Sequence, residues 1–544
     1  MSLRGSRALC DGVDRRAGLW KYRGMPRTDI SALVAEAAED VPDRQALVET
    51  GGRSLTWSRL EDEVGRLATG LGTHGVRAGQ RVMIVVGNRI EFVTTYLGVL
   101  RAQVVAVPVN PLSTAGEVSR MLADSGTRLV VADETSIDVV RAALAELDPG
   151  LARPVVVVTG TGPEGDELAL DDLRADVVRP VPPLPDPEKL AALLYTSGTS
   201  GRPRAAMLSH RALLANIEQV AAVEPPMMHG DDVVLGVLPL FHVYGLNAVL
   251  GGVLRHRARL LLVEHYDPQA VLDLIDDEAC SVVPIAPPVF THWLPDEHLR
   301  ERLGPVRLVL SGSAPLEAEV IEQFTSITGI PVHQGYGLTE AAPVVTSTLC
   351  SREPRDGSVG AALPGIELRL VDETWGQVEG EDPGQIQVRG DNLFSGYWPD
   401  GADGPDADGW YATGDVGLLD ASGDLSLVDR VKELIIVSGF NVYPTEVEDV
   451  LREVDGVADA AVIGVPDDET GEAVVAYVVP ADGARDARAH LEDALVDHAG
   501  VRLARFKRPS RIEVVDALPL TVTGKVQKGR LRGIERRRAL GILE

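Results

Sequence analysis

The feature that most constrains this chain is a loop of small residues between two apolar runs, within the stretch LAALLYTSGTSGRPRAAMLSH at 190–210. The first run, 191–195, is typical of a buried strand, and Ser209 is well suited to cap a following helix. Glycines let backbone N–H groups close around an anion, and hydroxyls add further donors. The loop contains Thr196, Ser197, Gly198, Thr199, Ser200 and Gly201, and Arg204 follows it. This pattern predicts a phosphate-binding loop.

Two other interpretations of the loop fit these residues less well. A flexible Ser/Gly linker would separate domains, whereas this loop joins two apolar elements and carries Arg202 and Arg204. A Walker A loop requires Gly-Lys-Ser/Thr after its variable residues, and no lysine occurs between residues 190 and 210. The loop is therefore expected to hold phosphate oxygens in an arrangement other than a Walker A motif.

Charge and cysteine content narrow the class of protein. A chain of 544 residues exceeds the size of one hydrophobic core, so two or more domains are expected. The net charge of −29 disfavours binding to nucleic acid or to anionic lipid, because both require a basic surface. The three cysteines, Cys10, Cys280 and Cys350, lack the spacing of a disulfide framework or a zinc site. We expect a cytoplasmic protein.

Neither a secretion signal nor a membrane span is predicted. Residues 1–28 mix both signs of charge and lack an apolar core, so we expect a flexible N-terminal extension rather than a signal peptide. The longest apolar run, 233–254, contains Pro239, His242, Asn247 and four glycines. A membrane helix requires about 20 apolar residues in succession. We interpret this run as core plus the wall of a binding site.

Periodicity predicts an α/β fold with a smaller second domain. Apolar runs such as 81–86, 104–109 and 129–131 alternate with helical spacing, as in mainly parallel sheets. From 357 to 424, short alternating stretches with many glycines favour a small β-barrel or sandwich. The fold class is therefore two α/β subdomains plus a small β-barrel, hinged to a small α+β domain. The expected boundaries are 29–428 for the large domain, 429–432 for the hinge and 433–544 for the C-terminal domain.

The loop resembles the phosphate-binding motif of the adenylate-forming (ANL) superfamily, which includes acyl-CoA synthetases, adenylation domains of peptide synthetases and beetle luciferases. The resemblance extends from about residue 29 to 532 and returns at six further motifs. It implies that 29–428 is an AMP-binding adenylation domain and that 433–544 is a mobile lid. One departure is Arg204-Ala205, where the family has Lys-Gly. Arginine differs from lysine in phosphate geometry, and alanine would be strained at a positive φ, so slower turnover is expected.

Further motifs carry the resemblance at the nucleotide site. Tyr336 within GYGLTE (335–340) offers an aromatic face to a purine. The small-residue turn SGSAPL (311–316) follows a strand, where open α/β sheets bind ligands; alone it is a weak signal. By resemblance, Asp415 in YATGD (411–415) accepts both ribose hydroxyls, and Arg430 supports it. The nucleotide-contacting residues implied are Gly312, Ser313, Ala314, Gly335, Tyr336, Gly337, Asp415 and Arg430.

Metal and carboxylate chemistry is expected close to the same motif. Glu340 supplies a hard oxygen of the kind that Mg²⁺ accepts, and Thr196 is the second candidate metal contact. Thr339 can hydrogen-bond the α-phosphate. The motif PLFHVYG (239–245) resembles the family's acyl-pocket motif, which implies that His242 lies at the mouth of the carboxylate site. A lone histidine in an apolar run is otherwise usually a core residue. The implied substrate contacts are His242, Val243, Tyr244, Gly335 and Leu338.

Two loops of the C-terminal domain are implicated. Lys525, in PLTVTGK (519–525), places a point charge at the tip of a glycine-containing loop. By resemblance it stabilises the charge that develops on the attacked α-phosphate. The motif SGFNV (438–442) implies that Gly439 lines the entry tunnel of the thiol. Lys432 matches the family's hinge, about which the C-terminal domain swings between two half-reactions.

The resemblance implies an acyl-CoA synthetase that uses ATP, Mg²⁺ and coenzyme A. The carboxylic acid is expected to be a medium- or long-chain fatty acid, on the basis of the apolar walls at 283–290 and after Tyr244. The alternatives are an aryl-CoA ligase, an acyl-AMP ligase that loads a carrier protein, and a non-catalytic nucleotide-binding protein. Against the last stand the intact Glu340, Asp415 and Lys525.

Overall fold

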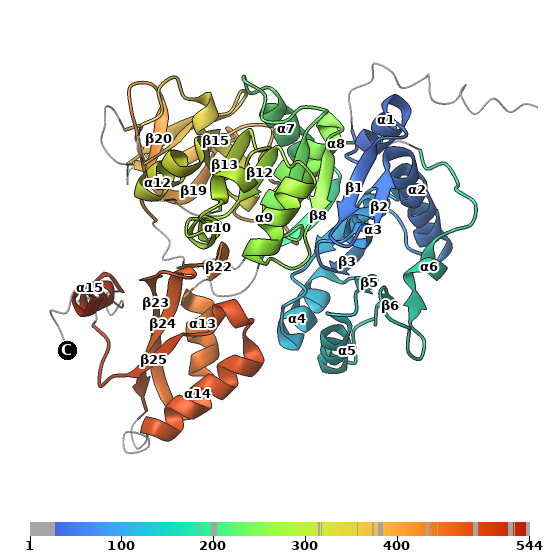
Figure 1. Cartoon of the computed structure of the whole chain (residues 1–544). Helices are drawn as coiled ribbons and strands as arrows, with labels where there is room; N and C mark the ends of the chain where they lie inside the picture. The colour runs from blue at the N-terminus through green and yellow to red at the C-terminus, as the bar shows by residue number, and fades with distance from the viewer. Residues whose placement is uncertain are drawn as a thin grey trace, which may run out of the picture.

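The chain forms a large α/β body and a smaller C-terminal body, which lies below it in Figure 1. The computed structural model describes residues 28–182, 184–196, 204–313, 316, 318–355, 357–372, 375–378, 384–430, 435–442, 444–481, 488–519, 526 and 528–539. The expected N-terminal extension up to residue 27 and hinge residues 431–432 lie outside these residues, and the domain boundaries stay predictions. No helix within the described ranges combines the length and apolarity that crossing a membrane requires.

A seven-stranded sheet has β8 and β9, the strands before and after the predicted phosphate loop, at one edge. Its order is β7-β6-β5-β3-β4-β8-β9, and adjacent strands are parallel except β8 and β9. Thr196 of β8 pairs with Arg204 of β9. The strands are β3 (Arg81–Val85), β4 (Val105–Pro108), β5 (Leu129–Ala132), β6 (Val155–Val158), β7 (Leu168–Ala169), β8 (Leu190–Thr196) and β9 (Arg204–Ser209).

Side-chain caps begin α4 and α7, which flank this sheet. In α4 the Thr114 hydroxyl accepts from the Glu117 backbone N–H, and the Glu117 carboxylate accepts from the Thr114 N–H, which forms a capping box. As expected, the Ser209 hydroxyl caps α7, accepting from Ala212 N at 3.2 Å. The helices up to this point are α1 (Ala32–Asp40), α2 (Trp57–Thr73), α3 (Ile90–Arg101), α4 (Ala115–Ser125), α5 (Ile137–Glu146), α6 (Leu170–Leu173) and α7 (His210–Ala221).

A thirteen-stranded sheet forms the rest of the large body, in the order β17-β18-β19-β20-β16-β15-β14-β13-β12-β10-β11-β1-β2. Its strands are β1 (Gln45–Glu49), β2 (Ser54–Thr56), β10 (Val233–Gly236), β11 (Arg259–Leu262), β12 (Val282–Ile285), β13 (Leu308–Ser311), β14 (Val332–Gly337), β15 (Val344–Ser347), β16 (Ser358–Ala362), β17 (Glu367–Val371), β18 (Gly384–Arg389), β19 (Tyr411–Leu419) and β20 (Asp424–Arg430).

The direction of pairing changes within β14. Its first half pairs parallel with β13, and residues 335–337 pair antiparallel with β15. The expected glycine-rich β unit is therefore present as antiparallel strands that continue the parallel sheet. The helices of this half are η2 (Tyr244–Gly251, a π-helix), α8 (Gly252–His256), α9 (Pro268–Asp277), α10 (Pro287–Trp293), α11 (Leu299–Arg302), α12 (Ala318–Thr328), and the short 3₁₀ turns η3 (Thr339–Ala341) and η4 (Thr348–Cys350).

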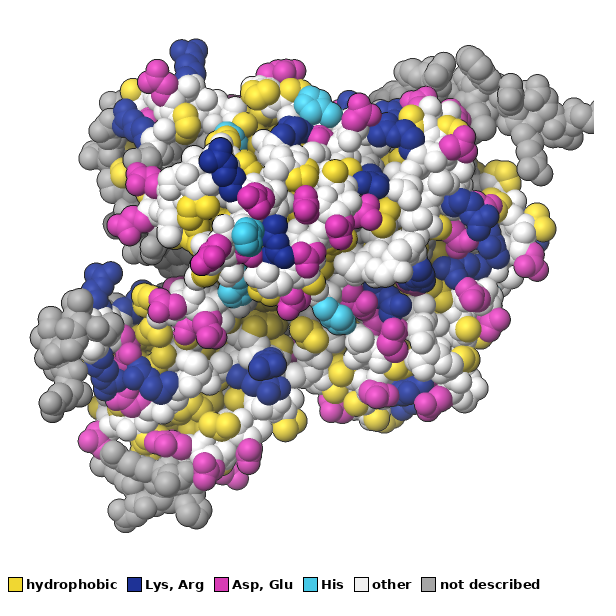
Figure 2. Space-filling view, in the orientation of Figure 1, with side chains coloured by type: hydrophobic (Ala, Val, Ile, Leu, Met, Phe, Trp, Pro, Cys, Tyr) yellow, Lys and Arg dark blue, Asp and Glu magenta, His cyan; other side chains and the backbone are white. Residues whose placement is uncertain are grey.

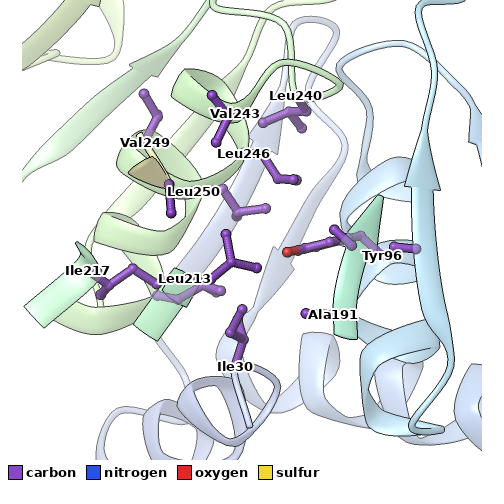
Figure 3. Packing of buried hydrophobic residues seen from close by; sticks show 14 of the residues in the cluster. Ile30, Tyr96, Ala191, Leu213, Ile217, Leu240, Val243, Leu246, Val249 and Leu250 are labelled. Atoms are coloured by element: carbon purple, nitrogen blue, oxygen red, sulfur yellow. The ribbon is translucent and has the colours of Figure 1, made fainter. Parts of the chain in front are cut away.

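One hydrophobic core joins the two α/β halves. Figure 3 shows Tyr96 of α3 and Ala191 of β8 facing Leu213 of α7 and Leu250 of η2, and all of them are at most 1% exposed. Because α7 and η2 are fixed by this core, the inner face of η2 can form a rigid wall for a ligand site.

The C-terminal body has its own sheet and core. Its strand order is β22-β21-β24-β23, with β25 paired to β24. A separate apolar cluster that includes Val447, Val462 and Leu495 lies on this sheet. The elements are β21 (Ile435–Val437), β22 (Phe440–Val442), α13 (Pro444–Arg452), β23 (Val457–Asp467), β24 (Gly471–Pro480), α14 (Arg488–Arg502), η6 (Arg505–Lys507), β25 (Arg511–Val514) and α15 (Lys528–Ala539).

The two bodies meet through a buried charge cluster and stacked rings. Lys507 Nζ lies 2.9 Å from Glu446 of its own body and 2.9 Å from Glu117 of the large body. Phe440 stacks on Phe241 of the large body, with ring centroids 6.2 Å apart. On the face in Figure 2, basic and acidic side chains are interspersed, without a continuous basic patch.

Candidate active site

One large cavity lies at the carboxyl ends of β13 and β14, where the sheet changes from parallel to antiparallel pairing. Open α/β sheets bind ligands outside the carboxyl ends of their parallel strands. The cavity extends from the predicted nucleotide motifs to the π-helix η2. Its described lining residues are Thr196, Val220, Met227, Met228, His242, Val243, Tyr244, Ala248, Val249, Pro284, Leu310, Ser311, Gly312, Ser313, His333, Gln334, Gly335, Tyr336, Gly337, Leu338, Thr339, Glu340, Pro343, Val344, Thr346, Ser347, Thr413 and Asp415.

Asp415 and Tyr336, the residues expected to contact ribose and purine, lie together in the cavity lining. The Tyr336 hydroxyl donates to Asp415 Oδ2 at 2.6 Å, which fixes the ring and the carboxylate relative to each other. Asp415 also pairs in register with Arg430, from β19 to β20. Ser313 has a φ of +73° on a non-glycine residue at this end of the cavity. Strained backbone of this kind persists where the surroundings hold it, often at ligand sites.

Glu340 is anchored by a residue that the sequence did not single out. The Tyr397 hydroxyl donates to Glu340 Oε1, and Phe394 N donates to the Glu340 carbonyl at 2.9 Å. Burial and the Glu340 charge raise the pKa of Tyr397, so its hydroxyl stays protonated and remains a donor. Glu340 itself lines the cavity.

The donor set fits Mg²⁺ carried by a nucleotide. Within the described ranges, no group of three or more His, Cys, Asp and Glu side chains could hold a metal ion. A single carboxylate and the Thr196 hydroxyl agree with the usual mode of Mg²⁺ binding, in which phosphates and waters supply most ligands. Glu340 and Thr196 would hold the ion, which would neutralise charge on the phosphates.

His242 lies at the junction of the polar and apolar parts of the cavity. Its Nδ1 accepts from the Tyr244 backbone N–H at 3.3 Å, so in the neutral ring the proton is on Nε2. Burial lowers the pKa of His242 to about 4, because desolvation disfavours the charged ring. At neutral pH His242 is therefore an uncharged hydrogen-bond donor.

Tyr244 and Gly312 form a narrow part of the cavity. A Cβ atom added at Gly312 would lie 2.7 Å from Tyr244 Cε1, so the close approach of this ring depends on glycine. Beyond it, Val220, Met227, Met228 and Val249 form an apolar limb, as predicted for the run after Tyr244. The methionines lie outside the residues that the sequence had indicated.

The expected second apolar wall at 283–290 does not line this limb. Pro284 is its single described residue in the cavity lining. Val283, Ile285, Val289 and Phe290 instead belong to a separate core cluster around Trp293 on the other face of the sheet. The prediction of a wall was wrong because Val283 and Ile285 alternate with Pro284 along β12 and face the other core, where Val289 and Phe290 of α10 also pack.

The Arg204 side chain contacts two protein groups, a carboxylate and an aromatic ring. Its Nη1 lies 2.6 Å from Asp403 Oδ2, and its Cζ lies 3.9 Å from the centroid of the Tyr397 ring. Ala205 is part of β9 and pairs with Tyr195, so the backbone there is extended and no strain arises from the missing glycine. The reason offered for slower turnover at Ala205 therefore does not apply.

Gly439 is presented to the large body at the tip of the β21–β22 hairpin. Ser438 and Gly439 have φ of +51° and +80°, as in the tight two-residue turns of hairpins. A Cβ added at Gly439 would lie 3.3 Å from Ala286 Cβ, so the hairpin tip reaches the large body. Its assignment to a thiol tunnel stays a prediction. Ser197, Gly198, Thr199, Ser200, Gly201, Ala314, Lys432 and Lys525 lie outside the described residues, as does the side chain of Arg430.

Family models match both parts of the chain. Residues 34–398 match the model described as AMP-binding enzyme, and residues 446–525 match that of the AMP-binding enzyme C-terminal domain. The chain belongs to the AMP-binding enzyme family. This places it in the adenylate-forming superfamily, as the sequence motifs indicated.

Curated relatives of this AMP-binding enzyme are CoA ligases. The chain is 34% identical over 522 residues to 4-coumarate–CoA ligase 5 of Oryza sativa subsp. japonica, covering 92% of this chain and 93% of the relative. It is 31% identical over 535 residues to a long-chain-fatty-acid–CoA ligase of Bacillus subtilis (strain 168), covering 93% and 94%. The chain is thus an AMP-forming acid–thiol ligase by family.

Solved structures of the superfamily agree in fold. Amide bond synthetase McbA of Marinactinospora thermotolerans aligns with a TM-score of 0.81 at 28% identity, covering 93% of this chain and 99% of that one. Apo MatB of Rhodopseudomonas palustris aligns with a TM-score of 0.69 at 32% identity, covering 94% and 99%. These neighbours confirm the fold class of large α/β sheets with a C-terminal domain.

Proposed function

We propose that this AMP-binding enzyme joins coenzyme A to an apolar monocarboxylic acid whose tail is of limited length. The observation that carries the proposal is one cavity with two unlike ends. Tyr336, Asp415 and Glu340 stand at the nucleotide end, and Met227 and Met228 stand at the apolar end. His242 lies between them, where a carboxylate would meet the α-phosphate.

The reaction proceeds in two displacements. A carboxylate oxygen of the acid attacks the α-phosphorus of ATP, and the bond to pyrophosphate breaks. The thiol sulfur then attacks the acyl carbon, loses its proton, and AMP leaves with the carboxyl oxygen. Positioning and charge stabilisation carry such steps. Neutral His242 donates from Nε2 to the carboxylate, and Lys525 supports the charge that develops on the phosphate.

The charges that line the cavity favour a single carboxylate on the substrate. Among its described lining residues, Glu340 and Asp415 are the only charged side chains, and both belong to the nucleotide end. The pKa of His333, like that of His242, is lowered by burial, which keeps both rings neutral. A second carboxylate would find no cation there, and an amino group would find no free acidic partner at the apolar end.

The apolar limb favours a medium-chain or arylalkenoic acid over a long-chain one. Met227 and Met228 are 7% and 4% exposed, so they close the limb from solvent. A small second cavity, lined also by Asn216, Asn247 and His256, lies behind them. The Tyr244 ring over Gly312 suits a flat or unbranched tail. One relative is named for the arylalkenoic acid 4-coumarate, and another is named for long-chain fatty acids.

Coenzyme A is the proposed thiol, and a carrier-protein arm is the alternative. Gly439 meets the large body near Ala286, which agrees with a narrow entry for pantetheine that either donor would use. The CoA-ligase relatives favour coenzyme A.

The test is AMP release with C4 to C16 fatty acids, cinnamate, 4-coumarate, a dicarboxylic acid and amino acids, each with and without coenzyme A. We expect coenzyme A-dependent turnover that peaks at C6–C10 or with the cinnamates. A maximum at C16 would refute the length limit, and turnover of amino acids would refute the substrate class. Saturable ATP binding without turnover of any acid would favour a non-catalytic nucleotide-binding protein.

A further inference from the structure

The side chain of Arg204 is held by protein partners on two sides. Asp403 pairs with Nη1 at 2.6 Å, and the Tyr397 ring lies 3.9 Å from Cζ. The Arg204 side chain is 28% exposed, so solvent screens its charge only in part. Arginine is suited to this arrangement, because its planar group can stack on a ring while its edge pairs with a carboxylate.

Backbone bonds hold Tyr397 against the strand that bears Arg204. Trp398 N donates to the Ala205 carbonyl at 2.8 Å, and Tyr397 N donates to the Ala402 carbonyl at 3.0 Å. The Tyr397 ring also packs edge-on against Phe394 at 5.1 Å. One face of the ring is thus available to the cation, and its hydroxyl is directed to Glu340.

The Tyr397 hydroxyl links this cluster to the cavity. It donates to Glu340 Oε1, and the hydroxyl of Tyr411 also interacts with it. Because this hydrogen bond holds one carboxylate oxygen of Glu340, the second oxygen keeps a defined direction. The metal-binding direction of Glu340 therefore depends on where Tyr397 is held.

We propose that Arg204 is a positioning residue that acts through Tyr397 on the Mg²⁺-binding orientation of Glu340, rather than a direct phosphate ligand. This deepens the proposed function and rests on it, because it concerns the same ATP site. Arg204 lies on β9, the strand that follows the predicted phosphate loop. The contacts run from Arg204 through Tyr397 to Glu340, the expected metal-binding carboxylate.

The decisive experiment is calorimetric binding of ATP to the full chain, with Mg²⁺ and with EDTA. Wild type is compared with Tyr397→Phe, which removes the hydroxyl and keeps the ring, and with Arg204→Met, which removes the cation. We expect metal-free ATP affinity to stay within about twofold of wild type in both variants. The gain in affinity from Mg²⁺ should fall about tenfold in Tyr397→Phe, as is typical for a lost bond to a charged group, and about threefold in Arg204→Met.

A double variant tests whether Arg204 acts through Tyr397. In the Tyr397→Phe background, Arg204→Met should change the Mg²⁺ gain little further, because the hydroxyl that transmits its effect is gone. Independent, additive losses would overturn the proposal. Arg204→Met that weakens ATP binding equally in EDTA would also overturn it, in favour of a direct phosphate contact.

A matched control exists in the same body. Arg389 stacks over Trp410 at 4.7 Å and pairs with Glu367, outside the cavity lining. Arg389→Met removes a similar cation, ring and carboxylate contact, and we expect it to leave the Mg²⁺ gain unchanged. An equal loss in this control would attribute the effect to general destabilisation and overturn the proposal. Wild-type protein that binds no ATP at all would reject the proposed function itself.

Discussion

The two ends of the cavity are built in different ways. At the nucleotide end, hydrogen bonds fix the reactive groups: Tyr336 to Asp415, and Tyr397 to Glu340. At the apolar end, the walls are aliphatic and thioether groups, including Met227 and Met228. Unbranched methionine side chains adapt to irregular shapes, whereas bonded carboxylates do not.

This difference separates what the site must keep from what it can vary. Charge develops at the phosphate in every turnover, and preorganised groups stabilise it without moving. The acid's tail only fills space, so its length can be changed by small alterations in volume. Substitutions at the nucleotide end should therefore remove activity, and those at the apolar end should redirect it.

The largest effect is expected at Glu340. Glu340→Gln keeps the shape but removes the charge that holds Mg²⁺, and we expect acyl-adenylate formation to fall about 10²–10³-fold. Thioester formation from supplied acyl-adenylate should change much less. Pyrophosphate release and single-turnover thioester assays measure the two steps. Glu367→Gln, an exposed carboxylate paired with Arg389, is the control. Equal loss in both steps would contradict the assigned role.

The next effect concerns the second step. Gly439→Leu introduces a side chain at a φ of +80° and directly against Ala286. The rate of thioester formation should fall about 10²-fold, which is the order of magnitude typical for the loss of one catalytic contact. The rate of adenylation should stay nearly unchanged. Lys525→Ala should show the reverse pattern. A thioester step that is unimpaired in Gly439→Leu would rule out the tunnel assignment.

A smaller effect should redirect the enzyme at its apolar end. Met228→Ala joins the limb to the small cavity behind it, and the ratio of kcat/KM for C12 to C6 acids should rise about tenfold. Gly252→Ala should lower this ratio, because its new Cβ would lie 3.0 Å from Met228 Sδ. Ratios cancel any loss of folded protein. An unchanged ratio in both variants would place the length limit elsewhere.

The smallest effect is on pH dependence. The pKa of His242 is about 4 in the folded chain, below the ordinary value of about 6.5. Between these values the unfolded chain binds a proton that the folded chain does not, so stability falls as pH falls. His242→Gln should lose a few °C less in Tm than wild type between pH 7 and pH 4.5. Thermal unfolding curves that shift in parallel would contradict this pKa.

Local patterns predicted several strands, and the family motifs predicted residues that meet in one cavity. The runs at 81–86, 104–109 and 129–131 are strands β3, β4 and β5. Asp415, Tyr336 and Glu340 line one cavity although about 75 residues separate the first from the others. Family motifs could predict this gathering because one motif lies at the end of β14 and the other at the start of β19, two strands of the same sheet.

Residues that act through distant contacts were missed. Tyr397 lies in SGYWPD, a stretch with turn residues and no periodicity, and its position arises from a β-bridge to Ala206 far away in the sequence. Met227 and Met228 follow α7 in a loop, so nothing local indicated that they close the limb. The π-helix η2 was also not expected, because its apolar run has no distinguishing period.

The most direct test of the account is a single-turnover experiment in which the products are measured in two stages. The enzyme is mixed with ATP, Mg²⁺ and octanoate or cinnamate, and pyrophosphate is measured before coenzyme A is added. We predict one equivalent of pyrophosphate per active site without the thiol, followed by stoichiometric AMP and thioester when coenzyme A arrives. Pyrophosphate release with no discharge by coenzyme A would contradict the ligase assignment, and no pyrophosphate with any acid would contradict adenylation itself.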